Sequence, residues 1–335
     1  MHTLHYEIYG TGSLNALFLH GGPGSGCFPN HARFFDPTKY RVVLLDQRGA
    51  GRSSPTACVI NNTLSHLVDD CELLRKHLLL QDQEEDEEDV SSSISSSILS
   101  SSISSSSSSS WDVILGGSWG TTVALAYAQT YPKSMKSLIL RGICTFRPSE
   151  IDWLFNKNLL HAYYDRLMAK TNDTNNMMLY DNNTSNGKTN DDVSVVDNNT
   201  IRLTAARSWM MWEMAASSSF KQNNNQSADT GNDDTRNVVL AMLTCYYSVN
   251  DIFVMGGPNC KNLLSKEPCS NLDPDLKIIG IQGGRDPICP PDTAIDLKAQ
   301  LSESKRMMEL RISLLSGHSM YDPAIMNEII QATDK

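Results

Sequence analysis

The chain has 335 residues, of which 40% are hydrophobic and 20% charged, and its formal net charge is -10 at pH 7. This composition supports a large buried core and excludes fibrous or wholly disordered proteins. Most of the acidic excess lies in the run DQEEDEED (82–89), so it describes one segment and not the whole surface. The sequence shows no basic stripe for nucleic acid and no apolar run near the ~18 residues of a membrane span.

The N-terminal stretch MHTLHYEIYG lacks the charged and apolar regions of a secretion signal. We therefore expect a soluble, cytoplasmic protein whose 8 cysteines are reduced and mostly buried. The cysteines are scattered without a C-x-x-C pair, so we expect no zinc or redox site.

Apolar, β-branched runs bounded by glycine recur along the chain. Continuous runs of this kind are typical of strands covered on both faces of a sheet. The runs are residues 16–22, 41–49, 112–118, 137–143, 276–284 and 308–317. Helical patterns lie between them over 63–80 and 119–132. This alternation predicts an α/β domain with a mostly parallel sheet.

The alternation stops between residues 146 and 270. Helical patterns over 205–220 and 237–249 replace it, and the strand pattern resumes near Lys277. We therefore predict a helical cap over 146–270, inserted between two parts of an α/β core. The two core parts are residues 1–145 and 271–335.

Low-complexity tracts interrupt this plan over 81–110 (acidic, then serine-rich), 171–200 and 221–236 (both asparagine-rich). Such tracts have too little apolar surface to offset the conformational entropy of ordering them. We expect disordered surface loops there.

The pentapeptide GGSWG (116–120) matches Gly-x-Ser-x-Gly, a weak pattern by itself. Its context strengthens it, because a predicted strand (112–115) precedes it and a predicted helix (121–129) follows it. A strand, a tight turn and a helix are what a nucleophile elbow requires. The flanking glycines permit the turn, which lifts Ser118 Oγ above the sheet.

A serine hydroxyl needs a base, and the base needs an orienting carboxylate. In this architecture the chain order is Ser, then Asp or Glu, then His. Asp286 follows one late strand in IQGGRDPICP, and His318 follows the next in LLSGHSM. The order predicts a triad of Ser118, Asp286 and His318.

An oxyanion hole needs two backbone N–H donors beside the nucleophile. One is expected from Trp119, which follows Ser118, and the other from the glycine-rich loop HGGPGSG (20–26), where we choose Gly22. The motif DQRGAGRS lacks the Lys-Ser/Thr of a phosphate-binding loop, so we expect Asp46 and Arg48 to fix that loop beside the oxyanion turn.

The chain resembles the proline iminopeptidases (prolyl aminopeptidases) of the α/β-hydrolase fold. The resemblance is carried by HGGPGSGC, DQRGAGRS, GGSWGTTVALAYAQTYP, LRGI, WMMWE, GGRDPICP and SGHS, and it covers the chain except the low-complexity tracts. It implies a serine aminopeptidase that releases proline from the N-terminus of peptides, under a helical cap and without metal or organic cofactor. It also implies the same triad of Ser118, Asp286 and His318, and the oxyanion hole of Gly22 and Trp119.

An aminopeptidase must bind a free, positively charged amine, and a partly buried carboxylate is the physical solution. Glu213 in WMMWE stands where the family places such an acid. A second acid that many members carry would fall near Thr244, where this chain has no carboxylate. Trp153 and Trp212 are candidates for the wall of a proline pocket or for core packing, and Cys289 lies three positions beyond Asp286.

The residues predict an acyl-enzyme mechanism with peptide substrates. Two alternatives remain open on the sequence alone. One is an esterase that uses the same triad on carboxylic esters. The other is a non-catalytic binding protein on this fold.

Overall fold

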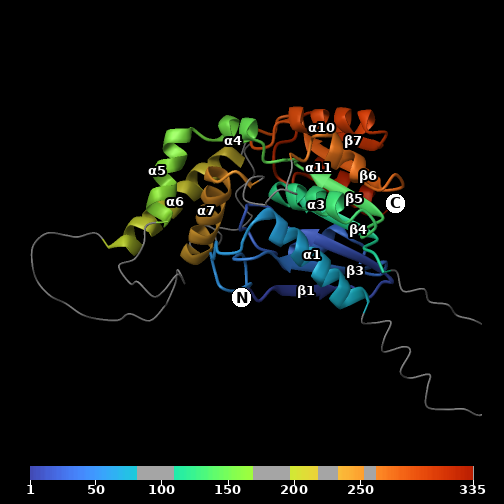
Figure 1. The fold of residues 1–335 in the computed structure, drawn as a ribbon, viewed down its shortest axis with the longest axis horizontal. Helices are drawn as coiled ribbons and strands as arrows, with labels where there is room; N and C mark the ends of the chain where they lie inside the picture. Colours follow the sequence, from blue (N-terminus) through green and yellow to red (C-terminus); the bar gives the residue numbers. More distant parts are fainter. Residues whose placement is uncertain (81–108, 169–196, 218–232, 253–261, 335) are drawn as a thin grey trace, which may run out of the picture.

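The computed structural model describes residues 1–80, 109–168, 197–217, 233–252 and 262–334. Its centre is a 7-stranded sheet in the order β1-β3-β2-β4-β5-β6-β7 (Figure 1). The strands are β1 (His5–Tyr9), β2 (Leu14–Leu19), β3 (Tyr40–Asp46), β4 (Val113–Gly117), β5 (Ser137–Arg141), β6 (Lys277–Gly283) and β7 (Met308–Ser313). Only β1 runs antiparallel to its neighbour within this sheet, so the prediction of a mostly parallel sheet is confirmed.

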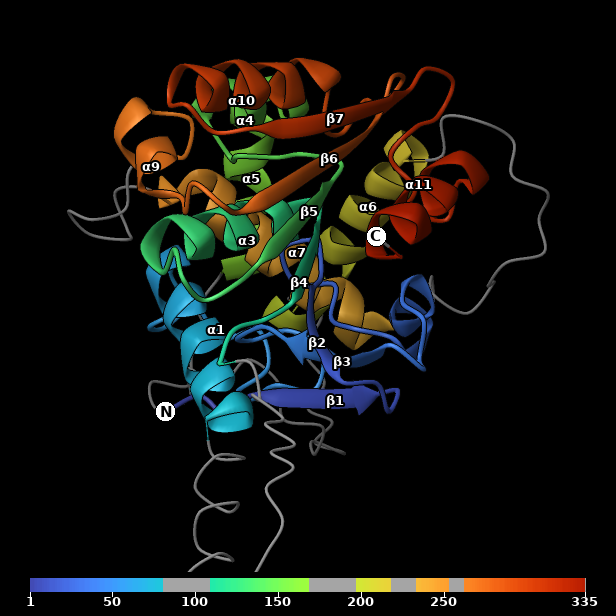
Figure 2. The same ribbon diagram turned by 90° about the vertical axis from the view of Figure 1, so that its right-hand side faces the viewer.

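Helices cover both faces of this sheet (Figure 2). The described helices are η1 (Pro29–Phe34), α1 (Leu64–Leu79), α3 (Trp119–Thr130), α4 (Pro148–Leu154), α5 (Lys157–Met168), α6 (Asn198–Ser217), α7 (Asp234–Val249), α9 (Lys266–Asn271), α10 (Pro291–Glu303) and α11 (Pro323–Thr333). Helices α1, α3 and α10 lie on one face, and η1 and α11 lie on the other.

The strands bury side chains on both faces because successive residues of a strand point to opposite sides. In β2, Leu17 and Leu19 pack into the cluster with α1 and α3, whereas Ala16 and Phe18 pack into the cluster with η1 and α11. The apolar runs that form β2 to β6 are therefore the central layer of the core. The run over 308–317 is not covered on both faces as expected, because β7 lies at the sheet edge and only its Met308 is buried. The carboxyl ends of β2, β4, β5, β6 and β7 meet at one edge, where polar loops follow them.

Helices α4 to α7 lie between β5 and β6 in the chain. Helices α5, α6 and α7 pack on one another and lie to one side of the sheet in Figure 1. Helix α9 packs against α3 and α10 instead, although the sequence analysis assigned residues up to 270 to the cap.

Two expected boundaries are corrected by the structure. Residues 198–200 belong to α6 and residues 234–236 to α7, so these ends of the asparagine-rich tracts are helical and not disordered loops. Asp233 caps α7 by accepting a hydrogen bond from the Arg236 N–H. The expected disorder of residues 81–108, 171–196 and 221–232 lies outside the described residues.

The sequence analysis did not predict strand β1, because its residues HYEIY are half-buried at the sheet edge and form no apolar run.

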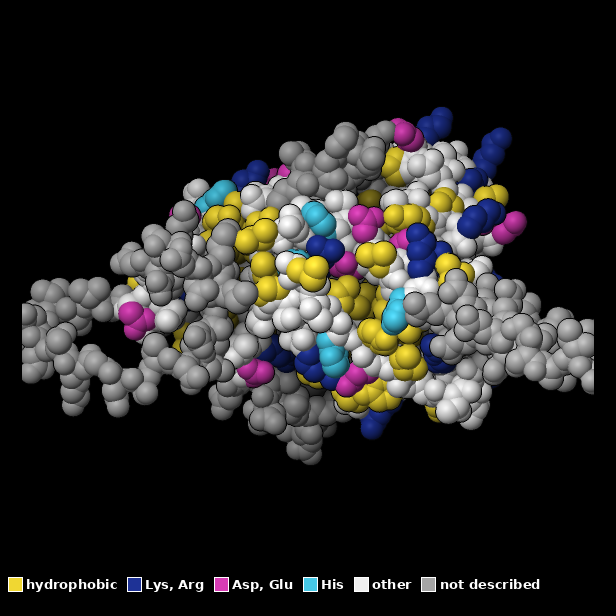
Figure 3. All heavy atoms as spheres, turned by 60° about the horizontal axis from the view of Figure 1, so that its bottom comes forward, with side chains coloured by type: hydrophobic (Ala, Val, Ile, Leu, Met, Phe, Trp, Pro, Cys, Tyr) yellow, Lys and Arg dark blue, Asp and Glu magenta, His cyan; other side chains and the backbone are white. Residues whose placement is uncertain are grey.

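Among the described helices, none is long and apolar enough to cross a membrane. The described cysteines are free thiols, and all except Cys144 are buried. On the face seen in Figure 3, the Lys and Arg side chains of the described residues are interspersed with acidic, hydrophobic and polar ones.

The start of α3 packs unusually close to β2. A Cβ atom built on Gly120 would overlap the Leu19 carbonyl oxygen, and one built on Gly116 would overlap the Gly120 carbonyl oxygen. Only glycine permits this backbone approach, so both glycines fix where the β4–α3 turn sits over the sheet.

Replacing Gly120 by Ala should therefore destabilise the fold by at least about 2 kcal/mol, because backbone must move to admit the methyl group. Urea denaturation measures this loss. Ala126→Gly, in the same helix, is the matched control and should cost about 1 kcal/mol through helix propensity. A Gly120→Ala loss no larger than that of the control would contradict the packing constraint.

Candidate active site

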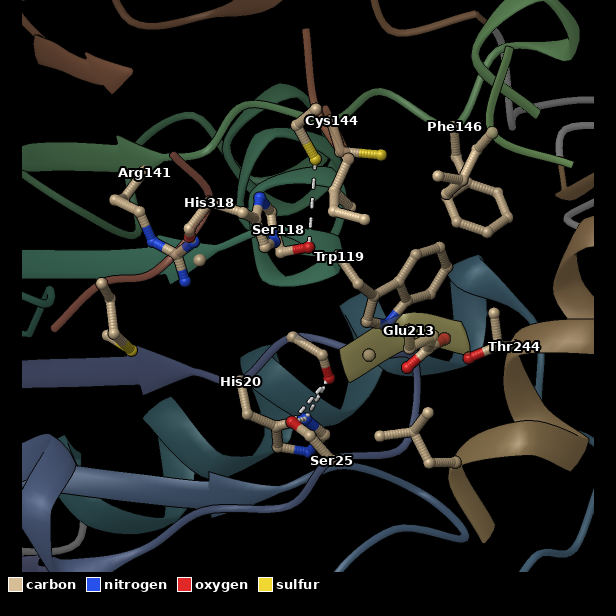
Figure 4. A pocket seen from close by; sticks show the side chains of 18 of the residues that line it. His20, Ser25, Ser118, Trp119, Arg141, Cys144, Phe146, Glu213, Thr244 and His318 are labelled. Atoms are coloured by element: carbon tan, nitrogen blue, oxygen red, sulfur yellow. Dashed lines mark hydrogen bonds between the residues drawn. The ribbon is translucent and has the colours of Figure 1, made fainter. Parts of the chain in front are cut away.

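Ser118 lies between the end of β4 and the start of α3 with backbone angles of φ 53 and ψ -124. A non-glycine residue in this left-handed region is strained and persists only where its surroundings hold it. The Ser118 N–H donates to the Arg141 carbonyl at 2.8 Å, and its carbonyl accepts from the Thr121 N–H at 2.7 Å. The predicted strand-turn-helix is present, and Ser118 Oγ points into a pocket (Figure 4).

Asp286 and His318 lie in the loops after β6 and β7, as expected. His318 Nδ1 lies 2.8 Å from Asp286 Oδ2, and the Asp286 side chain is buried. Asp286 Oδ1 also accepts the N–H groups of Ile288 and Cys289, each at 2.9 Å. A carboxylate held in this way accepts the Nδ1–H of His318 and leaves Nε2 as the basic nitrogen.

Ser118 and His318 line the same pocket. Within the part of the chain that the structure describes, no hydrogen bond joins Ser118 Oγ to the His318 ring, and Ser118 Oγ lies 4.0 Å from Cys289 Sγ. Hydrogen bonds to a nucleophile are often long before substrate binds and shorten in the complex. The three predicted residues thus come together at one edge of the sheet, with the Asp–His pair already formed.

The peptide between Gly21 and Gly22 is fixed by its carbonyl. That oxygen accepts from His20 Nδ1 at 2.9 Å and from Ser25 Oγ at 2.9 Å, while the Ser25 N–H approaches at 3.3 Å. The C=O and N–H of a trans peptide point in opposite directions. The Gly22 N–H is therefore directed away from these donors, and Gly22 lines the pocket.

Trp119 is the first residue of α3, and an N–H of the first helical turn has no partner within its helix. Its indole Nε1 donates to Gln47 Oε1 at 2.9 Å, and Gln47 Nε2 donates to the His20 carbonyl at 2.9 Å. The Gln47 N–H donates to His20 Nε2 at 3.1 Å, which leaves the His20 proton on Nδ1. Burial lowers the pKa of His20 and keeps it neutral. One buried network thus connects the two expected oxyanion donors.

Glu213 comes from α6 and lines the same pocket as Ser118. Its Oε1 accepts a hydrogen bond from Trp209 Nε1 at 2.8 Å. Burial raises the pKa of Glu213 to about 7, and the Trp209 hydrogen bond opposes this rise. The carboxyl is therefore poised to ionise fully when a cation approaches. The apolar lining around it is Phe146, Ile151, Leu154, Phe155 and Trp212.

A second carboxylate, Glu150, also lines the pocket but is fully occupied. Its oxygens accept from the N–H groups of Thr145 and Phe146 at 2.9 Å, from Thr145 Oγ1 at 2.6 Å and from Arg147 Nε at 2.8 Å. Glu150 fixes the loop after β5 and is not available to a ligand. Thr244, near which many family members carry a second acid, lines the pocket. Its Oγ1 donates to the Pro23 carbonyl at 3.2 Å.

The tryptophan candidates separate in the structure. Trp212 lines the pocket and packs against Phe155, whereas Trp153 is mostly exposed and donates to the Pro287 carbonyl at 3.1 Å. Cys289 lies beside Ser118, but a hydrogen bond with Cys144 and burial raise the pKa of its thiol well above the usual value. Cys289 is therefore near the site and is a poor nucleophile.

Asp46 and Arg48 tie the loop after β3 to neighbouring segments. Asp46 Oδ1 accepts from the Cys27 N–H at 2.6 Å, next to the glycine-rich loop, and Arg48 donates to Asp70 at 2.5 Å. Neither is among the residues that line the pocket. This agrees with the expected structural role.

Sequence reasoning missed several lining residues, including His20, Ser25, Arg141 and Glu150. A signal exists for His20 and Ser25, because both belong to the glycine-rich motif. Arg141 belongs to LRGI, one of the motifs that carry the family resemblance, but neither Arg141 nor Glu150 lies in a pattern that indicates a site. Among the described residues, no group of three or more His, Cys, Asp or Glu side chains is placed to hold a metal ion.

Residues 109–321 match a family model described as the alpha/beta hydrolase fold. The whole chain is 33% identical to a proline iminopeptidase of Arabidopsis thaliana, covering 77% of that protein. It is 32% identical to a probable proline iminopeptidase of Leptolyngbya boryana, covering 91% of that protein. An esterase from Exiguobacterium antarcticum has a similar structure, with a TM-score of 0.58, 13% identity, and coverage of 99% of this chain and 96% of that one. At this identity the structural likeness shows the fold alone.

The raised pKa of Glu213 makes a prediction for stability. Between the ordinary Glu pKa and about 7, the unfolded chain loses its proton while the folded protein keeps it, so a cost of ionisation appears as pH rises. Glu213→Gln removes this cost and should stabilise the protein by about 1–3 kcal/mol at pH 8 relative to its effect at pH 4.5. Urea denaturation at both pH values measures the difference. Glu303→Gln, on an exposed position of α10, is the control. A Glu213→Gln effect that is equal at both pH values would rule out the shifted carboxyl.

Proposed function

The chain belongs to the proline iminopeptidase family of the α/β-hydrolase fold, and we propose that it is a serine aminopeptidase that releases N-terminal proline from peptides. The observation that carries this proposal is one pocket lined by Ser118, by His318 with Asp286 behind it, and by Glu213. A nucleophile with its base explains acyl transfer. A carboxyl with a pKa near 7 explains why the substrate would carry a free amine.

In the proposed mechanism, His318 Nε2 takes the proton of Ser118 Oγ as that oxygen attacks the proline carbonyl carbon. The N–H groups of Trp119 and Gly22 donate to the oxyanion that forms. His318 then gives the proton to the leaving peptide amine, and the C–N bond breaks to leave a prolyl ester on Ser118. His318 next removes a proton from water, which attacks the ester and frees proline and Ser118. Asp286 keeps the imidazole in one tautomer throughout.

Recognition of the amine falls to Glu213. A secondary ammonium beside the carboxylate would replace the missing counter-charge and lower the pKa of Glu213 from about 7. The aromatic rings of Phe146, Phe155 and Trp212 suit the apolar part of a pyrrolidine ring. We treat the helices α4 to α7 as the cap that supplies this half of the pocket. Thr244 has no charge, and its hydroxyl is bonded to the Pro23 carbonyl. Glu213 is therefore the one carboxylate that we assign to recognition of the amine.

A cytoplasmic location, peptide partners and independence from cofactors belong to this proposal. Comparison of a prolyl arylamide with an aryl ester tests it against an esterase that uses the same triad. The proposal expects higher kcat/KM on the prolyl arylamide. Efficient turnover of the ester with none of the arylamide would favour the esterase.

Ser118→Ala should lower kcat for a prolyl arylamide by about 10⁴- to 10⁶-fold, because the acyl-enzyme cannot form. The purified variant should also fail to react with a serine-directed fluorophosphonate. Ser270→Ala, a change of the same size on an exposed position of α9, should keep the labelling. Near-normal turnover by Ser118→Ala would sink the nucleophile assignment, and an unlabelled wild-type protein would favour a binding protein.

Glu213→Gln should lower kcat/KM for prolyl arylamide by about 10- to 100-fold, through loss of a charge-assisted hydrogen bond to the ammonium. Hydrolysis of a simple aryl ester without an amine should change little. Steady-state kinetics on both substrates give the ratio. An equal loss on the ester would remove the proposed role of Glu213.

A further inference from the structure

Arg141 is a buried cation in the active-site pocket that the mechanism does not use. It ends β5, its side chain lines the pocket, and the residue is 7% exposed. Nη1 donates to the His318 carbonyl at 2.8 Å, while Nε is buried without a partner. Among the residues that the structure describes, Arg141 forms no ion pair within 4.0 Å. A buried charge without a counter-ion is costly, which points to a missing anion.

The charge of Asp286 acts on Arg141, but no hydrogen bond joins the two side chains among the described residues. The oxygens of Asp286 are taken by the N–H groups of Ile288 and Cys289, by His318 Nδ1 and by Gln282 Nε2 at 3.3 Å. Burial lowers the pKa of Arg141, and the charge of Asp286 only partly opposes this. A guanidinium stays protonated even so, and its planar fork matches a carboxylate.

His31 provides a second donor to the same pocket and is also 7% exposed. Its Nδ1 accepts the Phe28 N–H at 3.0 Å, so the ring proton is on Nε2. The ring is stacked on Phe18, with 4.4 Å between ring centroids, which fixes its orientation. Burial, together with the neighbouring His20 and Arg141, lowers the pKa of His31 to about 3, so the ring is a neutral N–H donor.

The two charged ends of the pocket lie on opposite sides of the nucleophile. Figure 4 shows Arg141 on one side of Ser118 and Glu213 with Thr244 on the other. A substrate whose amine meets Glu213 and whose carbonyl meets Ser118 directs its leaving part toward Arg141. The pocket has a volume of about 250 Å³, below the ~300–1,000 Å³ of sites that hold drug-sized ligands. Its size suits a short substrate.

We propose that Arg141 and His31 form a subsite for the C-terminal carboxylate of the substrate, so that the enzyme favours dipeptides with N-terminal proline. The inference rests on the proposed function and assigns the length of its substrate. Glu213 and Arg141 bind the two termini, and the scissile bond lies between them. Two N–H donors, one of them charged, satisfy the two oxygens of the carboxylate.

The test compares prolylglycine with prolylglycinamide, which differ only in the charge at the C-terminal end. Wild-type kcat/KM should be about tenfold or more higher for the acid, as expected for a charge-assisted hydrogen bond. Arg141→Gln should bring the ratio of the two kcat/KM values close to one. Because Arg141 also holds the His318 loop, this variant should lower both rates, and a purely structural role would leave the ratio unchanged. Met320→Leu, which lines the same pocket without a polar group, is the control and should keep the wild-type ratio.

Equal kcat/KM for acid and amide in the wild-type protein would overturn the subsite, as would an unchanged ratio in Arg141→Gln. A prolyl arylamide serves as the reference substrate. If the enzyme hydrolyses the prolyl arylamide but shows no preference for prolylglycine over prolylglycinamide, only this inference is contradicted. Failure to hydrolyse any prolyl substrate would contradict the proposed function itself.

Discussion

The close contact between the start of α3 and the end of β2 is the constraint on which the site depends. Gly120 lies against the Leu19 carbonyl, and this contact holds the turn that keeps Ser118 at φ 53. The same contact brings the glycine-rich loop after β2 next to the nucleophile, because His20 and Gly21 follow Leu19 directly. A Cβ atom built on Gly21 would lie 3.2 Å from the Ser118 Cβ. The nucleophile and the second oxyanion donor are thus positioned by one packing event.

Neither Glu213 nor Arg141 forms an ion pair among the described residues, and the charge of Asp286 compensates that of Arg141 only in part. Glu213 has an indole N–H as its hydrogen-bond partner, and Arg141 has a carbonyl. Each group is buried at a cost that a ligand of opposite charge would relieve. Glu150 shows the contrast, since the hydrogen bonds of its own loop satisfy its oxygens. A zwitterionic peptide complements both ends, which ties amine recognition and substrate length to the same physical cause.

The sequence predicted the parts of the site that follow from chain order. Ser118 and Asp286 each follow a buried apolar strand, His318 follows the edge strand β7, and carboxyl ends of parallel strands meet at one edge. Glu213 could be placed through the family resemblance alone, because its environment depends on how α6 packs over the core. Arg141 belongs to the motif LRGI, but no local pattern at Arg141, His31 or Glu150 indicates a role in a site, and only tertiary contacts give their surroundings. Strand β1 and the first turn of α6 could not be predicted for a related reason. Their residues are half-exposed or polar, so they show no hydrophobic periodicity, and neighbouring elements determine their conformation.

The central claim is that one pocket joins acyl-transfer chemistry to recognition of a free N-terminal proline. The most direct test measures kcat/KM for a prolyl arylamide and for its N-acetylated form on the wild-type protein. Acetylation removes the positive charge and leaves the scissile bond, the ring and the leaving group unchanged. The account predicts a preference of about 100-fold or more for the free amine, since the acetylated form offers Glu213 no positive charge and leaves the Trp209 Nε1–H as its hydrogen-bond partner. Comparable kcat/KM for the two substrates would contradict it.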